Sequence, residues 1–209
     1  MKREWLRLPP ETHFEMGAHV GRFSSAVILA LIPEYPVFVV SEIPNYHYVG
    51  DGEIELSGMT TIEWAEAVVR EWHSFTRLTS CRAWVDPETE FAKEVMRSKL
   101  RLRKNLNRGP ELRTEILREY FLEKKLYFAP WLTILPSEVS KAQWPPEAIL
   151  GRQARLVGSD YSLNALEQVI SRRPRVRSTC SPAPSTFMAR MQAERGIKTT
   201  KSDSHLGNL

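Results

Sequence analysis

The stretch SSAVILALIPEYPVFVVSEI, residues Ser24–Ile43, decides the fold. It holds two apolar runs rich in β-branched residues, Ser24 to Ile32 and Val37 to Ile43, and such runs are typical of buried strands. The Pro33–Pro36 segment between them predicts a tight turn. A shorter strand is expected upstream over Thr12 to Gly17, with a turn from Gly17 to Gly21. Three successive strands of this kind predict a β-meander.

Downstream of the meander, the pattern alternates between helix and strand. A helix is predicted from Thr61, because Thr60 and Glu63 have the spacing of a capping box. Residues 45–57 read as a loop. Further strands are expected over Cys81–Val85 and Leu126–Phe128, and further helices over Glu88–Arg97, Pro110–Lys124, Ser137–Gln143 and Asp160–Ser171. A meander, an alternating segment and a C-terminal helix are the layout of an RNase H-like α/β fold, a mixed sheet flanked by helices.

Length and composition predict one domain with a tail. The 209 residues, 42% of them hydrophobic, suffice for one substantial core. We therefore expect a domain over residues 1–171 and a basic, disordered tail over 172–209, where Pro, Ser, Arg and Thr dominate. The sequence has no apolar run of 18 residues, so a transmembrane or signal segment is not predicted. Cys81 and Cys180 lack metal-site spacing, which favours reduced thiols in a cytoplasmic protein.

Three carboxylates stand at predicted strand ends or at a helix start. Glu15 lies in the first strand, Asp86 follows an apolar strand, and Asp160 opens the last helix. Oxygen ligands of this kind suit one or two Mg²⁺ or Mn²⁺ ions, which stabilise the attacking and leaving oxygens of a phosphodiester. Glu42, at the end of another meander strand, is a weaker candidate.

Each candidate also has a structural interpretation. Asp86 could cap the following helix, Asp160 could be a plain N-cap, and Glu15 could be a surface acid of an edge strand. His13 and His19 flank the first acid, and we expect surface hydrogen bonding from both.

Positive charge is concentrated at two places in the chain. Of the 29 basic and 25 acidic residues, 10 and 4 lie in residues 151–209, which leaves 19 basic against 21 acidic in residues 1–150. Within the first part, one run is free of acids and is the predicted contact to DNA phosphates: Lys99, Arg101, Arg103, Lys104 and Arg108. The alternative is a solvated surface.

Several motifs, in order over about residues 12–170, resemble the nuclease domain of phage terminase large subunits. The similar segments are FEMG (Phe14–Gly17), WVDP (Trp84–Pro87), the run Asn107–Pro130, Gln143-Trp144 and DYSLNALEQV (Asp160–Val169). The resemblance implies Glu15, Asp86 and Asp160 as catalytic metal ligands. The sequence departs from the family pattern at Glu15, which replaces Asp, at Tyr161, which replaces His, and at Asn164, which replaces Asp.

The resemblance implies a Mg²⁺- or Mn²⁺-dependent endonuclease that cuts concatemeric viral double-stranded DNA during genome packaging, in the host cytoplasm. The chain has no GxxxxGK[ST] motif, so a packaging ATPase is expected as a separate partner, with a small terminase or a portal protein as further partners and no membrane. Two alternatives stay open: a catalytically impaired module that docks DNA or a portal, and another RNase H-like nuclease such as a resolvase.

Overall fold

The computed structural model describes residues 8–50, 53–76, 82–85, 89–98, 100, 103–104, 110–142 and 161–173. All of them belong to one compact unit, Met1–Val176. No helix within these ranges is long and apolar enough to cross a membrane. The predicted tail lies outside the described residues except for Arg172 and Arg173, whose N–H groups bond back to carbonyl oxygens of the last helix.

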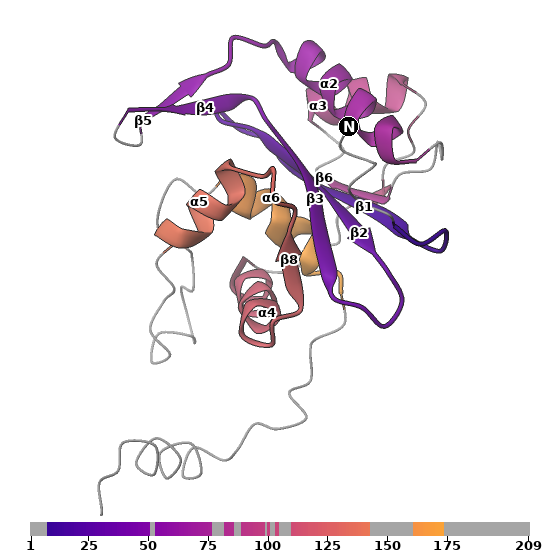
Figure 1. Ribbon diagram of the computed structural model, residues 1–209. Helices are drawn as coiled ribbons and strands as arrows, with labels where there is room; N and C mark the ends of the chain where they lie inside the picture. Colours follow the sequence, from indigo (N-terminus) through magenta and orange to yellow (C-terminus); the bar gives the residue numbers. More distant parts are fainter. Residues whose placement is uncertain are drawn as a thin grey trace, which may run out of the picture. The chain divides into compact units, whose positions relative to one another are not determined.

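A six-stranded mixed sheet forms the centre of the unit, in the order β7-β6-β1-β2-β3-β8 (Figure 1). The predicted meander is confirmed, because β1 pairs antiparallel with β2 and β2 antiparallel with β3. On either side of it, β6 runs parallel to β1 and β8 runs parallel to β3. The strands are β1 (His13–His19), β2 (Ser25–Leu31), β3 (Val37–Pro44), β6 (Arg82–Val85), β7 (Arg103–Lys104) and β8 (Leu126–Phe128).

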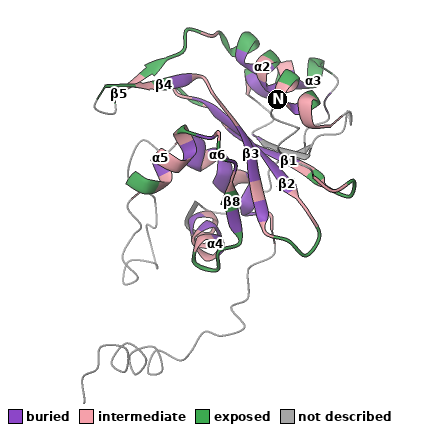
Figure 2. Ribbon diagram, in the orientation of Figure 1, coloured by how far each residue is buried: buried purple, intermediate pink, exposed green. Residues whose placement is uncertain are grey.

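Helices cover both faces of this sheet (Figure 1). On one face lie α2 (Thr61–Phe75) and α3 (Glu90–Arg97), and on the other lie α4 (Pro110–Leu122), α5 (Ile134–Lys141) and α6 (Tyr161–Ile170). Because side chains alternate along a strand, β2 and β3 supply both cores: Ile28 and Val40 pack toward α2, and Val27 and Val39 pack toward α6. The central strands are accordingly buried along most of their length (Figure 2).

The start of α2 follows the predicted chemistry. The Thr60 hydroxyl accepts the N–H of Glu63, and the Glu63 carboxylate accepts the N–H of Thr60, which completes a capping box. Behind this start, Trp64 and Trp72 are 1% exposed and fill the core on that face. The predicted helix and its capping box are therefore confirmed.

Two predictions about loops are wrong. Residues 45–57 contain a hairpin, β4 (Tyr46–Val49) paired antiparallel with β5 (Glu53–Leu56), in place of the expected loop. The predicted turn at Gly17 is also wrong, because β1 continues to His19. Gly17 lies in mid-strand, where a Cβ would lie 2.1 Å from the carbonyl oxygen of Ala165 in α6. This glycine is needed for close helix–strand packing, not for a turn.

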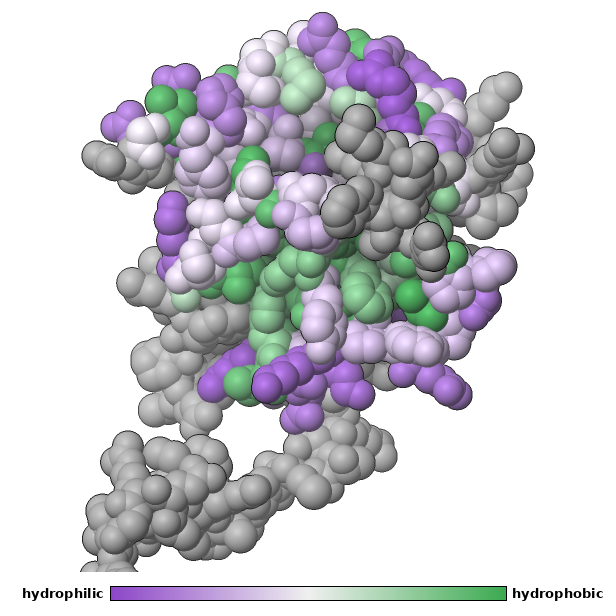
Figure 3. Space-filling model, in the orientation of Figure 1, coloured by the Kyte–Doolittle hydropathy of each residue, from purple (hydrophilic) through white to green (hydrophobic). Residues whose placement is uncertain are grey.

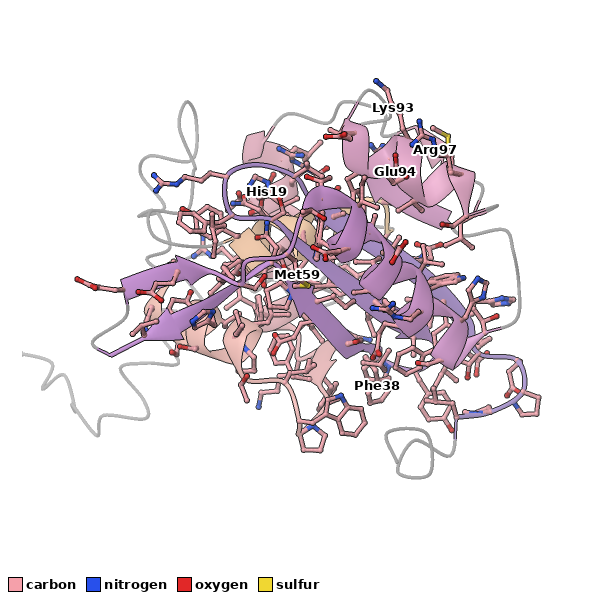
Figure 4. The ribbon with its side chains drawn as sticks, turned by 90° about the horizontal axis from the view of Figure 1, so that it is seen from above. His19, Phe38, Met59, Lys93, Glu94 and Arg97 are labelled. Atoms are coloured by element: carbon pink, nitrogen blue, oxygen red, sulfur yellow. The ribbon has the colours of Figure 1, made fainter. Side chains whose placement is uncertain are left out.

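Apolar residues gather on one face of the unit where β3 and β8 form the edge of the sheet, with hydrophilic residues above and below them (Figure 3). Phe38 of β3 stacks on Tyr127 of β8, with ring centroids 5.7 Å apart, and Tyr127 is 48% exposed. Figure 4 shows Phe38 on the side of the unit away from His19.

Candidate functional site

Helix α6 crosses strand β1 in the antiparallel direction. At the end of β1, the His19 imidazole stacks on the Tyr161 ring of the first turn of α6, with centroids 5.9 Å apart. In the middle, Gly17 faces Ala165 and Val169. At the start of β1, Glu15 forms an ion pair with Arg173, just beyond α6. Residues 15, 17 and 19 therefore share the face of β1 that α6 covers, and Figure 4 shows His19 beside the ribbon of α6.

The end of β6 lies next to this junction. Gly17 pairs with Trp84 in the parallel register of β1 and β6, so the same register brings Val85 beside Ala18. The end of β1, the end of β6 and the start of α6 thus meet at one corner of the unit. In the sequence, Asp86 directly follows Val85 and Asp160 directly precedes Tyr161. Asp86 and Asp160 themselves lie outside the described residues, so their approach to one another stays a prediction.

Glu15 is buried at the opposite end of α6. Its side chain is 4% exposed, and its carboxylate pairs with the guanidinium of Arg173. At a helical rise of about 1.5 Å per residue, the last residue of α6, Ile170, lies roughly 14 Å from Tyr161, and Arg173 follows three residues later. These contacts give Glu15 a structural partner. The prediction that it joins Asp86 and Asp160 is not tested by the described residues.

Glu42 caps helix α5. Its Oε1 accepts the backbone N–H groups of Thr133 and Ile134 at 2.6 and 2.9 Å, and its Oε2 accepts that of Leu135 at 2.7 Å. Thr133, the N-cap residue, makes no capping bond with its own side chain. A carboxylate from β3 therefore satisfies the first donors of α5, where the helix dipole also favours negative charge. This contact explains the position of the Glu42 carboxylate without a metal.

Sequence reasoning missed a second capping carboxylate, Glu138 of α5, which is 2% exposed. Its Oε2 accepts the N–H of Leu163 in the first turn of α6 at 2.9 Å. Its Oε1 accepts the hydroxyls of Tyr46 at 2.5 Å and Tyr48 at 3.2 Å. No sequence signal marked it, because an acid in the middle of a short helix looks like an ordinary surface residue.

The Tyr46 hydroxyl extends this network to the sheet. It lies 2.9 Å from the Ser162 hydroxyl, which lies 2.7 Å from that of Ser25 in β2. Burial, and after it the negative charge of Glu138, raise the pKa of Tyr46. The tyrosine therefore stays a neutral donor, and the first turn of α6 is fixed by bonds to β2, β4 and α5.

Whether a divalent metal can bind here depends on which potential ligand side chains already have other partners. Among the described residues there is no group of three His, Cys, Asp or Glu side chains that could hold a metal ion. Glu15, Glu42 and Glu138 serve Arg173, α5 and α6 respectively. At the corner itself, the described residues supply one such donor, His19. Asp86 follows Val85 and Asp160 precedes Tyr161 in the sequence, but both lie outside the described residues, so a complete donor set stays a prediction. If both carboxylates reach the corner, together with the imidazole they would suit a divalent transition metal.

The basic run predicted to contact DNA lies next to this corner at one point. Arg103 and Lys104 form β7, which pairs with Trp84 and Val85 of β6. Lys99, Arg101 and Arg108 lie outside the described residues. The prediction that the run binds phosphate therefore stays a prediction, with β7 as its described part.

Solved structures with a similar architecture include large terminases and large terminase nuclease domains of bacteriophages. The chain is similar to the large terminase of a thermophilic bacteriophage, with 13% identity, a TM-score of 0.56, and coverage of 78% of this chain and 40% of that one. It is also similar to the g2p (large terminase) nuclease domain of bacteriophage SPP1 with bound Mn, with 11% identity, a TM-score of 0.54, and coverage of 82% and 91%. It is similar as well to the large terminase nuclease of thermophilic phage G20c, with 13% identity, a TM-score of 0.53, and coverage of 79% of this chain and 85% of that one. That nuclease is also known with bound magnesium and with bound cobalt.

These similarities establish the fold. The chain has the RNase H-like fold of large terminase nuclease domains, as the sequence predicted. It spans 40% of the length of the first large terminase named above, which is a longer protein. The sequence matches no protein-family model and no curated protein.

Proposed function

We propose that this chain is a metal-dependent endonuclease that cuts double-stranded DNA in a terminase-like packaging system. The observation that carries the proposal is the corner where the ends of β1 and β6 meet the start of α6. The same fold occurs in phage nuclease domains, one of them with bound Mn.

In this proposal, Asp86 and Asp160 hold the metal from the ends of β6 and α6, together with a residue of β1. Glu15 is the β1 ligand implied by the sequence. A bound divalent ion supplies charge stabilisation for the phosphodiester oxygens. The Glu138 network fixes the first turn of α6, which keeps the approach of this helix to β1 constant. The basic run neutralises backbone phosphates beside the corner.

The second candidate is a DNA- or portal-docking module without catalysis. One observation favours it: the Glu15 carboxylate is engaged by Arg173. The two candidates differ in one measurable property, which is cleavage.

The test is nicking of supercoiled plasmid by the purified chain, with Mg²⁺, Mn²⁺ or no divalent metal. We expect nicking only with metal, and loss of nicking in Asp86→Ala and in Asp160→Ala, since each change removes a charge and a ligand at once. Glu66→Ala is the matched control, because Glu66 is an exposed acid of α2 on the other face of the sheet. Its activity should equal that of the parent.

Two results would overturn the proposal. If neither metal supported cleavage of duplex DNA, the non-catalytic docking module would be the remaining candidate function. Preference for an RNA–DNA hybrid or a branched junction over plasmid duplex would indicate another RNase H-like nuclease.

A further inference from the structure

The identity of the β1 ligand follows from the direction of α6. A metal held by residues next to Val85 and Tyr161 needs its third donor near the end of β1 and on the face that α6 covers. Strand residues rise about 3.3 Å each, so Glu15 lies roughly 13 Å along the strand from His19. Its carboxylate pairs with Arg173 at the far end of the helix.

We propose that His19 supplies the β1 ligand of this metal, so that an imidazole nitrogen stands where the sequence implied a carboxylate. This inference rests on the proposed metal site. His19 is the last residue of β1, shares the face of Gly17, and stacks on the first residue of α6. It is half-buried, which leaves part of the ring accessible from solvent.

The surroundings of His19 hold its ring in place. Tyr161, which stacks on the imidazole, is itself packed on Phe23 at 5.1 Å and on Tyr46 at 5.5 Å between ring centroids. On the turn after β1, a Cβ at Gly21 would lie 3.4 Å from His19 Nε2, so this position leaves room for the ring. A ligand with restricted rotation loses less entropy when it binds a metal.

An imidazole ligand changes which metal the site prefers. Mg²⁺ favours oxygen ligands, whereas nitrogen ligands suit later transition metals such as Co²⁺. We therefore expect the chain to select Co²⁺ and Mn²⁺ over Mg²⁺, and His19→Asp to shift that selectivity toward Mg²⁺.

The experiment measures metal binding without DNA. Titration calorimetry with Mn²⁺, and absorption spectroscopy with Co²⁺, are applied to the parent, His19→Ala, His19→Asp, Glu15→Gln and His13→Ala. His13 is the matched control, since it is an exposed histidine of the same strand. Loss of a supporting residue around a metal typically costs about 10–100-fold in affinity, so loss of a direct ligand should cost His19→Ala at least about tenfold. The Co²⁺ absorption spectrum should change with it, while the control His13→Ala should bind like the parent. Glu15→Gln compares the two candidate β1 ligands, and its metal affinity should fall much less than that of His19→Ala.

The inference would be overturned if His19→Ala had the parent's Mn²⁺ affinity and an unchanged Co²⁺ absorption spectrum. It would also be overturned if metal affinity fell in Glu15→Gln and in no other variant. Its failure is distinguishable from failure of the endonuclease proposal. If the parent binds metal through His19 but does not nick plasmid, only the endonuclease proposal is overturned. If the parent nicks plasmid with metal but His19→Ala binds metal as tightly as the parent does, only the His19 inference is overturned. A parent that binds neither metal overturns both.

Discussion

Glu15 and His19 lie on the same face of one strand but have different neighbours. Glu15 faces a guanidinium in a buried setting, where a paired carboxylate stabilises the fold and an unpaired partner is costly. His19 faces an aromatic ring at a half-buried corner. These contacts indicate a structural role for Glu15, whereas His19 is the candidate metal ligand.

Replacing Glu15 with Gln should therefore destabilise the protein. The change leaves Arg173 beside a neutral amide, and we expect a loss of about 1–3 kcal/mol in the free energy of unfolding. Urea denaturation followed by circular dichroism measures it, with Glu66→Gln as the exposed control. A variant as stable as the parent would contradict the structural role of the pair.

Gly17→Ala tests the close approach of α6. The new Cβ would meet the Ala165 carbonyl at 2.1 Å and Val169 at 3.0 Å, so the helix has to move. Overpacking of this kind costs about 1–3 kcal/mol in stability. Thermal unfolding measures the loss, and Gly21→Ala, whose nearest contact is 3.4 Å away, should change stability much less. Equal effects at the two glycines would show that the contact is not restrictive.

Individual residues were harder to predict than the strands that carry them. The position of Glu42 at a strand end was visible in sequence, but its three N–H partners come from a helix some ninety residues later. Glu138 gave no signal at all. Both roles depend on which helix start the carboxylate reaches, and only the tertiary fold determines that.

At the scale of elements, two carboxylates connect the strands and helices around α6. Glu42 joins β3 to α5, and Glu138 joins α5 to α6. Each accepts N–H groups in the first turn of a helix with a carboxylate from another element, so the two helix starts are held to their neighbours.

Tyr46→Phe should weaken this connection and change its response to alkali. The pKa of Tyr46 is raised from the ordinary value of 10.0, so its contribution to stability is complete below that pH and is lost as the pH rises above it, toward the folded-state pKa. In the parent, stability should fall steeply above about pH 10. The stability of Tyr46→Phe should be about 1–3 kcal/mol lower at pH 7, because the buried Glu138 carboxylate loses the shorter of its two hydroxyl donors, and it should then fall less steeply in alkali.

Urea denaturation at pH 7 and at several alkaline pH values measures both effects. Tyr127→Phe, at an exposed tyrosine of β8, is the control. Parallel pH profiles for Tyr46→Phe and the parent would contradict the assignment.

Most elements were predictable, because hydrophobic period and capping chemistry are local signals. The meander, α2 and β8 were predicted close to their observed bounds. The hairpin of β4 and β5 was missed because its glycines and acids resemble a loop. β1 was predicted two residues short, since Gly17 looks like a turn residue unless α6 is known to press on it.

At the scale of the whole molecule, charge should govern DNA affinity. Arg103 and Lys104 form the outermost strand beside β6. Replacing Arg101, Arg103 and Lys104 with Ala should weaken binding to unrelated duplexes alike and lower the slope of log affinity against log salt by roughly one unit per lost phosphate contact.

Fluorescence anisotropy across a salt series measures this slope. Metal binding by calorimetry should stay unchanged, because these side chains supply no oxygen ligand. Replacing Arg70 of α2 together with Lys93 and Arg97 of α3, three exposed basic residues, is the matched control for lost charge. A triple variant with the parent's affinity and slope would show that the run is an ordinary solvated surface.

The antiparallel packing of α6 on β1 also determines when the domain can be completed during synthesis. The bond between Ser25 and Ser162 closes a separation of 137 residues, so the ribosome delivers the sheet long before the helix that completes it. A nascent chain that stalls before Tyr161 exposes apolar residues of β2 that α6 otherwise covers, Val27 and Leu29, and lacks one side of the corner. In the proposed endonuclease, the metal corner would therefore form only after β1 and β6 had emerged and α6 had docked on them.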